Sequence, residues 1–466
     1  MALRQALKTP SPMRLLSQLW RRVCGEPAVR SATPLAVRSF GVTAAPVDPA
    51  PVFASTGNGG ADERFVVTRE AMLNRDMAVV GYEFAQTGEA TDAAHALERD
   101  RALLHHATGA DARALVGARL AFVTMGHKLL FDPAVDALAG SGIFPLLRAA
   151  DGLNELHIAR IAALRKAGVP TALAAGQAAL DNPALAAVVS GAFFSVDAFL
   201  PPDLLHISRQ FARQHPGMKL GVRGIETQEE FDACGRMHFA WFHGPFIRRR
   251  GEWSQNRADP GALRVCDLLA RLRCGAELAE IAEQIRLDPM ISYRLLRVAN
   301  SAAVGASRHI TSIRDATLIF GREPLYRWLV LLLCVCGPAR PAQQVLLEHA
   351  LARGRLMELL AGPGATPEAR QSLFLTGLLS LLDLMLRVPM PALLTQLALP
   401  PEVGAAISTK SGPCALPLQL AEAAERGNEP LVMALCVEMR LSLARLNQMQ
   451  AAAGAWAQAQ AQGLSA

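Results

Sequence analysis

The sequence predicts a two-part fold, a (β/α) barrel followed by an all-helical region. Between Phe65 and about Arg250, short segments rich in β-branched and aromatic residues alternate with helical stretches, at a repeat of about 25 residues. From Gly261 to about Ala453, one helical pattern follows another and no strand pattern interrupts them. Alternation of strands and helices favours a parallel sheet closed as a barrel, and a doubly wound sheet is the alternative.

The first half is predicted to contain strands at 77–84, 119–124, 171–175, 192–196, 219–225 and 240–246. Helices are expected between them at 92–107, 154–166, 178–189, 203–213 and 228–236. In a (β/α) barrel the chemistry lies at the carboxyl ends of the strands, so residues that follow each strand are the site candidates. No G-x-G-x-x-G turn and no Walker-type loop follows a strand, which excludes the usual nucleotide cradles.

The second half is predicted to be helical throughout. Asp288 and Pro289 supply an N-cap acceptor and a proline at the first helical position. Ser312 and Asp315 have the spacing of a capping box, with aspartate in place of glutamate. The expected helices are 262–272, 277–286, 290–303, 312–320, 324–336, 343–360, 368–386, 417–425 and 430–450.

Composition divides the chain further. Residues 1–62 are rich in Pro, Ala, Ser and Arg, with almost no acid before Asp48, and predict a disordered basic tail. An organellar transit peptide is the alternative for this segment. The polar segment around Arg248 to Asp259 predicts a linker. The expected organisation is tail 1–62, barrel 63–250, linker 251–260, helical domain 261–453 and flexible C-terminal tail 454–466.

Overall composition bounds the class of protein. Hydrophobic residues make up 51% and charged residues 19%, enough for sizeable cores. The most apolar run, 328–337, is about half the length of a bilayer span of about twenty residues, so we expect no membrane span. A net charge of +6 is a weak bias that does not imply nucleic acid. Eight cysteines without a C-x-x-C pair predict buried thiols in a reducing cytoplasm.

Segments of the helical half carry a family resemblance. The sequences D-P at 288–289, L-L-R-V-A-N-S-A at 295–302 and I-T-S-I-R-D-A at 310–316 resemble the core signature of the HDOD domain. This domain is a helical output module related to HD-type phosphohydrolases, which the resemblance implies here. No His-Asp doublet occurs in the chain, so we expect a non-catalytic domain. The signature positions are Asp288, Pro289, Asn300, Ser301, Ser312 and Gly321.

The first half then resembles an EAL domain. Arg69 and G-Y-E-F at 81–84 look like its opening, and G-I-E-T at 224–227 with F-H-G-P-F at 242–246 looks like its close. The stretch 374–383 is similar to one found where HDOD follows EAL. Together the resemblance covers nearly all of 66–449. It implies a barrel that binds two divalent metals and hydrolyses cyclic di-GMP.

The site positions of that family are only partly kept. Three acids match and are interpreted as vestigial EAL-site acids: Glu83, Asp197 and Glu226. The other positions align with Thr87, Val123 or Thr124, Ala174, Ala175, Ser195, Arg223 and His243. Two hard cations would lack ligands in such a set. We therefore expect a degenerate EAL barrel that is not an enzyme, with no metal and no cofactor.

The expected function is bacterial signal transduction through protein–protein interaction, in the cytoplasm, with other signalling proteins as partners and without nucleic acid. The alternatives are a sensor that binds cyclic di-GMP without hydrolysis and an active cyclic di-GMP phosphodiesterase. Asn300 is expected to be structural, bonding the backbone of the loop that follows it. Asp383 is expected to make a local hydrogen bond or to face solvent.

Overall fold

The computed structural model describes most of the chain from residue 65 onward. The described ranges are 65–87, 92–109, 119–148, 153–250, 259–300, 310–336, 341–362, 364–397 and 399–465. The predicted tail 1–62 lies outside them, as do residues 251–258 of the predicted linker. The last two linker residues are described, and Pro260 already begins a helix.

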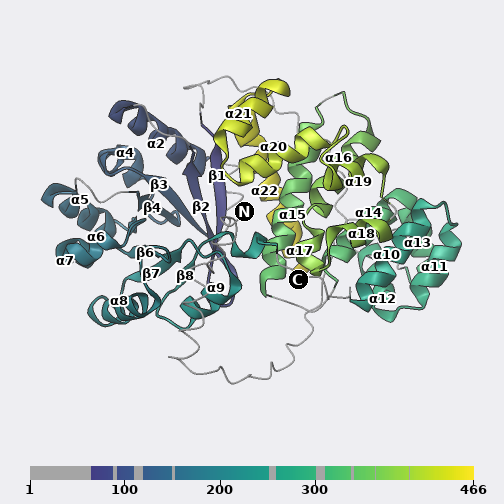
Figure 1. Ribbon diagram of the computed structural model, residues 1–466, viewed down its shortest axis with the longest axis horizontal. Coiled ribbons are helices and arrows are strands. Elements are labelled where there is room, and N and C mark those ends of the chain that lie inside the picture. The colour runs from purple at the N-terminus through teal and green to yellow at the C-terminus, as the bar shows by residue number, and fades with distance from the viewer. Residues whose placement is uncertain are drawn as a thin grey trace, which may run out of the picture. The chain divides into compact units, whose positions relative to one another are not determined.

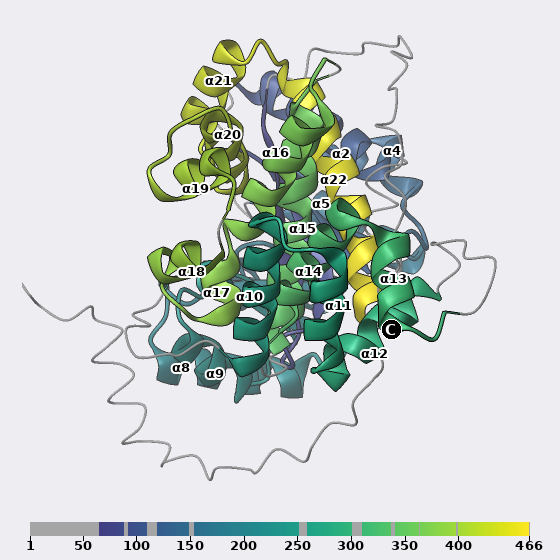
Figure 2. The same ribbon diagram turned by 90° about the vertical axis from the view of Figure 1, so that its right-hand side faces the viewer.

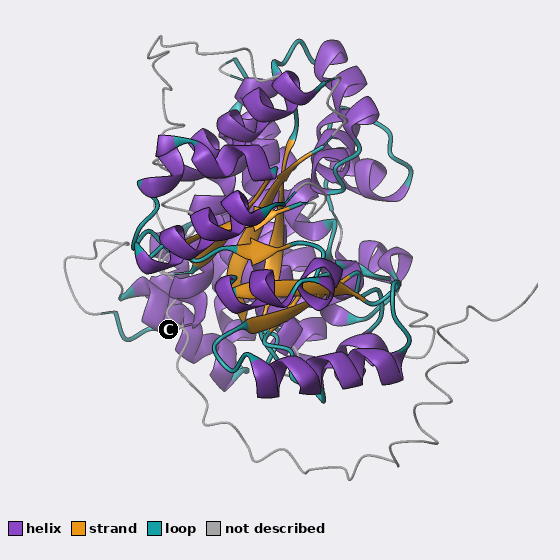
Figure 3. Cartoon of the chain, turned by 90° about the vertical axis from the view of Figure 1, so that its left-hand side faces the viewer, coloured by secondary structure: helices purple, strands orange, loops and turns teal. Residues whose placement is uncertain are grey.

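Eight strands close into one barrel in chain order, which confirms the predicted (β/α) barrel and rules out the doubly wound sheet. The strands, drawn in orange in Figure 3, are β1 (Val67–Leu73), β2 (Val79–Gln86), β3 (Leu120–Met125), β4 (Ile143–Leu147), β5 (Ala172–Leu173), β6 (Gly191–Ser195), β7 (Lys219–Arg223) and β8 (Trp241–Phe242). The pairs β2–β3 and β4 through β8 are parallel. β1 runs antiparallel to β8, with Leu73 opposite Phe242. The sequence patterns missed β1 and β4.

Helices connect these strands and begin where the sequence supplies caps. Asp92, Asn154 and Thr227 each accept backbone N–H bonds at a helix start. Figure 1 shows α5, α6 and α7 side by side. The helical elements are α2 (Ala93–Thr108), η1 (His127–Phe131), α4 (Pro133–Asp136), α5 (Glu155–Lys166), α6 (Gln177–Asp181), α7 (Pro183–Val188), α8 (Pro201–Gln214), α9 (Gln228–Gly235) and η2 (Pro245–Arg248).

The described residues group into two compact units. The first holds 72–75 and 125–249, and the second holds β1 up to Ala71, residues 76–124 and everything from Arg250. This grouping differs from the predicted domain limits, because β2, α2 and most of β1 and β3 cluster with the helical region. Within the second unit, hydrogen bonds join β1 and β2 to the helical region, which accounts for the grouping.

Aromatic packing builds the core of the first unit. Phe193 on β6 stacks on Trp241 of β8 with ring centroids 5.5 Å apart. Two glycines make room for these rings. A Cβ at Gly191 would lie 2.7 Å from Trp241, and one at Gly221 would lie 2.3 Å from Phe193. Glycine inside these strands is therefore required by the close approach of the aromatic rings.

The second unit contains the helices from residue 260 onward, with α15 and α22 side by side (Figure 2). They are α10 (Pro260–Arg273), α11 (Leu278–Arg286), α12 (Pro289–Ala299), α13 (Ile313–Phe320), α14 (Arg322–Cys334), α15 (Pro341–Leu360), α16 (Pro367–Leu379), α17 (Leu382–Leu386), α18 (Met390–Leu397), α19 (Pro401–Ser408), α20 (Ala415–Glu425), α21 (Glu429–Glu438) and α22 (Leu443–Ser465). This confirms the all-helical prediction. The sequence patterns missed α18 and α19.

Two helix limits and one terminus correct the prediction. The stretch 368–386 divides into α16 and α17, and 430–450 divides into α21 and α22. The second break lies at Arg440, whose φ of 52° is left-handed and ends the helix. The flexible tail expected at 454–466 is wrong, because α22 continues to Ser465 and buries Ala457 and Ala461.

A buried asparagine joins β1 to the helical region. Asn447 on α22 accepts a hydrogen bond from the Val67 N–H at 3.1 Å and donates one to the Phe65 carbonyl at 3.0 Å. Val66, between them, belongs to the apolar core formed with α15, α20 and α22. The amide of Asn447 thus satisfies backbone groups at the start of β1 as a neighbouring strand would.

Most of the described cysteines are buried, as the composition predicts. Of the described cysteines, five are buried, while Cys336 is half-buried and Cys274 is exposed. Burial raises the pKa of Cys334 to about 12, which keeps it an inert thiol. Among the described helices, none has both the length and the apolar character needed to cross a membrane.

Candidate functional site

Strands β2 and β3 position the first of the three acids. Side chains alternate along β2, so Tyr82 and Phe84 share one face and Glu83 lies on the other. Glu83 is buried, with 7% of its surface exposed, and it accepts a hydrogen bond from the Thr124 hydroxyl at 3.1 Å. This places a buried carboxylate and a hydroxyl near the carboxyl ends of two parallel strands, where barrel chemistry is located.

The ends of β6 and β7 bring together the second acid and its neighbours in the first unit. Asp197 follows β6 and is exposed. Gly224 follows β7 with a left-handed φ of 75°, and a Cβ there would lie 3.3 Å from Asp197 Oδ2 and 3.4 Å from Ser195 Oγ. Glycine is thus favoured at this position by its backbone angle, and the Asp197 and Ser195 side chains lie close beside it.

The two closing segments of the EAL resemblance lie against each other. Gly244 packs on Ile225 so closely that a Cβ would lie 2.2 Å from the Ile225 carbonyl oxygen. The Ile225 N–H donates to the His243 carbonyl at 3.2 Å, and the Phe246 N–H donates to the Ile225 carbonyl at 3.3 Å. Residues 224–227 and 242–246 therefore form one local structure at the ends of β7 and β8.

Glu226, the third acid, is exposed on this structure and pairs with Arg249 at 2.8 Å. The arginine that stands where the family has an acid is Arg223. Its guanidinium lies over the Phe193 ring, 5.3 Å from the centroid, and Arg223 is opposite Ser195 in the β6–β7 register. Positive charge therefore lies at the carboxyl end of β7.

The two divalent metals that the resemblance implies were tested against these residues. Thr124, Ala174 and Ser195 stand at strand ends without a carboxylate, and Glu226 is neutralised by its arginine. Within the residues that the structure describes, no group of three or more His, Cys, Asp or Glu side chains lies close enough to hold a metal ion. This set of side chains does not fit a two-metal site, and no step is derived through metal ions.

The HDOD signature residues act at helix ends. The Asp288 carboxylate accepts from the N–H groups of Met290 and Ile291, at 2.9 and 3.1 Å, and caps α12 with Pro289 at its first position. Ser312 caps α13, and Gly321 joins α13 to α14 with a φ of 72°. Ser301 lies outside the described residues.

Asn300 joins the end of α12 to the start of the segment before α13. Its Nδ2 donates to the Leu296 carbonyl at 2.8 Å and to the Ile310 carbonyl at 2.7 Å, and its Oδ1 accepts from the Ile310 N–H at 2.7 Å. These are side-chain-to-backbone bonds of the kind the sequence predicts. The amide uses both donor hydrogens and its oxygen on the protein backbone.

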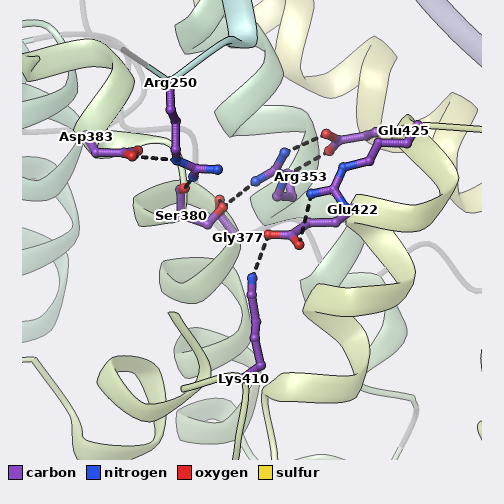
Figure 4. A network of polar contacts seen from close by, with 9 residues as sticks. Arg250, Arg353, Gly377, Ser380, Asp383, Lys410, Glu422 and Glu425 are labelled. Carbon is purple, nitrogen blue, oxygen red and sulfur yellow. Dashed lines mark hydrogen bonds and ion pairs between the residues drawn. The ribbon is translucent and has the colours of Figure 1, made fainter. Parts of the chain in front are cut away.

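A charged network of the helical region was missed by sequence reasoning (Figure 4). Asp383 is buried and pairs with Arg250 at 2.6 Å, so the expectation of a local bond or solvent exposure is wrong. Arg353 donates two bonds to Glu425, at 2.8 and 2.5 Å, and one to the Ser380 hydroxyl at 2.7 Å. The partners are 133 and 72 residues apart in sequence, beyond the range of any local pattern.

A second network connects β2 and β3 to α15. The Tyr82 hydroxyl donates to Glu348, and Arg119 contacts both Tyr82 and Glu348, the latter at 3.1 Å. Burial raises the pKa of Glu348 to about 7, although the charge of Arg69 opposes this. Burial also lowers the pKa of Arg119. A carboxyl group with such a pKa titrates near neutral pH in direct contact with the strand that carries Glu83.

Comparison with known proteins assigns the helical region. Residues 266–397 match the HDOD domain family model. Cyclic di-GMP phosphodiesterase CdgJ from Vibrio cholerae is 27% identical over 236 residues, which are 50% of this chain and 54% of that protein. The chain thus spans about half the length of this curated relative. The uncharacterized protein YuxH of Bacillus subtilis is 24% identical over 74% of this chain and 86% of its own length.

One solved structure shows a distant likeness to part of this chain. The Bacillus subtilis YkuI protein, with an EAL domain, was solved with substrate c-di-GMP and calcium. It is 16% identical, covers 48% of this chain and 72% of its own, and has a TM-score of 0.33. The recognition of an HDOD domain is confirmed for residues 266–397, and the closed eight-stranded barrel is of the kind that the EAL resemblance implies. The expectation that the chain is not an enzyme is contradicted, because the curated relative is a named phosphodiesterase.

Proposed function

We propose that this EAL-and-HDOD signalling protein recognises cyclic di-GMP at the carboxyl ends of its barrel strands. The buried Glu83 with its Thr124 partner is the structural observation that carries the proposal, because these two side chains occupy the family's ligand-bearing strand ends. The name of the Vibrio relative supports the choice of ligand. The HDOD domain is proposed to pass the state of the barrel to partner signalling proteins.

Charge at the strand ends supports an anionic ligand. Cyclic di-GMP carries two phosphodiester groups, each with one negative charge. Arg223 at the end of β7 places positive charge at the strand ends that precede Asp197 and Glu226. A guanidinium is well suited to a phosphodiester because its N–H groups match two phosphate oxygens.

Hydrolysis of cyclic di-GMP is a second candidate function, and the name of the Vibrio relative favours it. Hydrolysis of a phosphodiester requires a base near the attacking water. Glu83 is the residue that we assign to this task, since it is a buried acid at a strand end. The Thr124 hydroxyl, which donates to Glu83, would orient the carboxylate.

One experiment tests both candidates on the full chain. Binding of cyclic di-GMP is measured by calorimetry, and its hydrolysis is followed in the same samples by chromatography. Glu83→Gln is expected to weaken binding at least about tenfold, equivalent to about 1.4 kcal/mol, because the carboxylate would accept from guanine N–H groups of the ligand, and to remove any turnover. Glu98→Gln on the exposed face of α2 is the matched control and should change neither.

The outcomes separate the proposals. Binding and turnover that both depend on Glu83 support the phosphodiesterase. Binding that depends on Glu83 without turnover supports recognition alone. Absence of both in the parent protein, or equal binding by the parent and Glu83→Gln, contradicts the assignment of the barrel to cyclic di-GMP.

A further inference from the structure

The second compact unit contains a cavity of about 50 Å³ that the proposed function does not use. Strands β1 and β2 form one wall, and helices α2, α15, α20 and α22 form the others. The polar residues that line it are Arg69, His106, His349, Arg353, Glu425, Asn447 and Gln450.

Two donors at this cavity are buried without a hydrogen-bond acceptor. Among the described residues, neither Arg69 Nη1 nor Gln450 Nε2 has a partner. A buried donor left unpaired costs about 1–3 kcal/mol, and more when it is charged. In native proteins such groups are usually satisfied by a water molecule or an ion. Two of them at one cavity indicate an acceptor between them.

Three other polar residues of the wall, Arg353, Glu425 and Asn447, already hydrogen-bond within the protein. Arg353 is held by both oxygens of Glu425 and by the Ser380 hydroxyl, as Figure 4 shows. Asn447 is bonded to the backbone of β1. These contacts do not compete for an occupant, so the unpaired donors of Arg69 and Gln450 define where it would be held.

The charges around the cavity are unbalanced. Of the residues that line the cavity, Arg69 and Arg353 carry two positive charges and Glu425 carries one negative charge. Arg69 also lies over the Tyr82 ring, 5.0 Å from the centroid, which fixes the direction of its guanidinium. A buried excess of positive charge favours an anion over a neutral acceptor.

We propose that this cavity is a binding site for a small oxyanion, a phosphate or a short carboxylate, held by Arg69 and Gln450. The guanidinium would supply charge and a directed donor, and the amide of Gln450 would supply a second donor. The volume equals that of about three or four water molecules, which is enough for such an ion. Ordered water is the competing occupant.

Thermal unfolding of the full chain tests the proposal. Inorganic phosphate and acetate are titrated in separate series at constant ionic strength, with chloride as the replaced ion. The parent protein is expected to show a saturable rise in Tm with at least one of them, and the series that saturates identifies the class of oxyanion. Arg69→Gln should weaken binding, so the half-saturating concentration should rise at least tenfold. Arg286→Gln, an exposed arginine on α11, is the control and should behave as the parent.

A second variant guards against loss of folding. Gln450→Leu removes one donor and keeps the charge of Arg69, so it should also weaken the response, measured by calorimetry if its Tm is low. A rise in Tm that is linear and equal in all variants would show that the cavity holds water only. A saturable response that survives in both Arg69→Gln and Gln450→Leu would place the anion elsewhere. Either result overturns the proposal, and neither depends on cyclic di-GMP.

Discussion

At the scale of single residues, Asn300 shows how a short polar side chain can hold two chain segments together. It makes three hydrogen bonds to backbone groups of residues 296 and 310. These bonds hold the end of α12 beside Ile310, which lies ten residues further along the chain. Ile310, which it pairs on both sides, is buried. The amide thus replaces a pair of backbone groups that would otherwise be unsatisfied away from water.

Replacement of Asn300 is expected to destabilise the fold. Asn300→Ala leaves the Ile310 N–H and carbonyl without their partner, which should lower the free energy of unfolding by about 2 kcal/mol. Ser312→Ala, which removes one N-cap acceptor nearby, should cost about 1 kcal/mol and serves as the comparison. Denaturant unfolding of both variants measures the difference.

Partner capture is the second measurement on the same variant. Because its amide is used by the backbone, Asn300→Ala should lose partner affinity only as far as it loses stability. A variant as stable as the parent that no longer captures its partner would make Asn300 a recognition residue. Equal stabilities of Asn300→Ala and the parent would also contradict the bridging role.

At the scale of elements, the sequence predicts local structure well and contacts between distant elements poorly. The caps at Asp288 and Ser312 and most helices from 260 to 360 follow from residue patterns that span only a few positions. The two-residue strands β5 and β8 were still found, since their neighbours are aromatic or apolar. β1 was missed because its polar residues, Thr68 to Glu70, do not read as a buried strand.

The candidate site follows the same rule. The position of Glu83 on a strand came from its motif, but its hydrogen bond to Thr124 depends on the register of two strands. The ion pairs of Asp383 and Glu348 join residues more than one hundred positions apart, and no periodicity reports them. The tail from 454 was misjudged because its Gln and Ala pattern lacks large apolar residues, although the alanines pack.

Helix α15 contributes a pH-dependent contact with β2 and β3. The folded pKa of Glu348 is about 7, above the ordinary value of 4.5, because burial outweighs the attraction of Arg69. Between these two pH values the unfolded chain releases the proton first, so stability falls as pH rises from about 4.5 to about 7. The change for this group is about 3 kcal/mol, to an order of magnitude.

Unfolding free energies measured across that pH range check the contribution of Glu348. Glu348→Gln stays neutral and should flatten the slope that the parent shows. Glu98→Gln, an exposed acid on α2, should leave the slope unchanged. A parent slope that the Glu348 variant keeps in full would mean that another group carries the titration.

At the scale of the whole molecule, the arrangement of contacts bears on whether the two halves of the chain are independent. The sequence predicts halves that fold separately across 251–260. In the second compact unit, however, β1 is bonded to Asn447 of α22, and Tyr82 and Arg119 are bonded to Glu348 of α15. Tyr82, Glu348 and Asn447 are buried, and separation of the halves would leave them unpaired. Val66 would also leave the apolar core that it shares with the helices.

A cut in the chain tests this coupling. We insert a specific protease site between Arg250 and Asp259, cleave the folded protein, and measure its mass in solution. The two pieces are expected to stay together, because Asn447 and Glu348 of the second piece hydrogen-bond to the first piece. Val66 of the first piece also packs in the apolar core of the second. The combined variant Tyr82→Phe and Asn447→Ala removes two of these polar contacts and should let the pieces separate at lower denaturant than the cleaved parent. Pieces of the cleaved parent that separate without denaturant, each with its own cooperative unfolding, would restore the prediction of two independent halves.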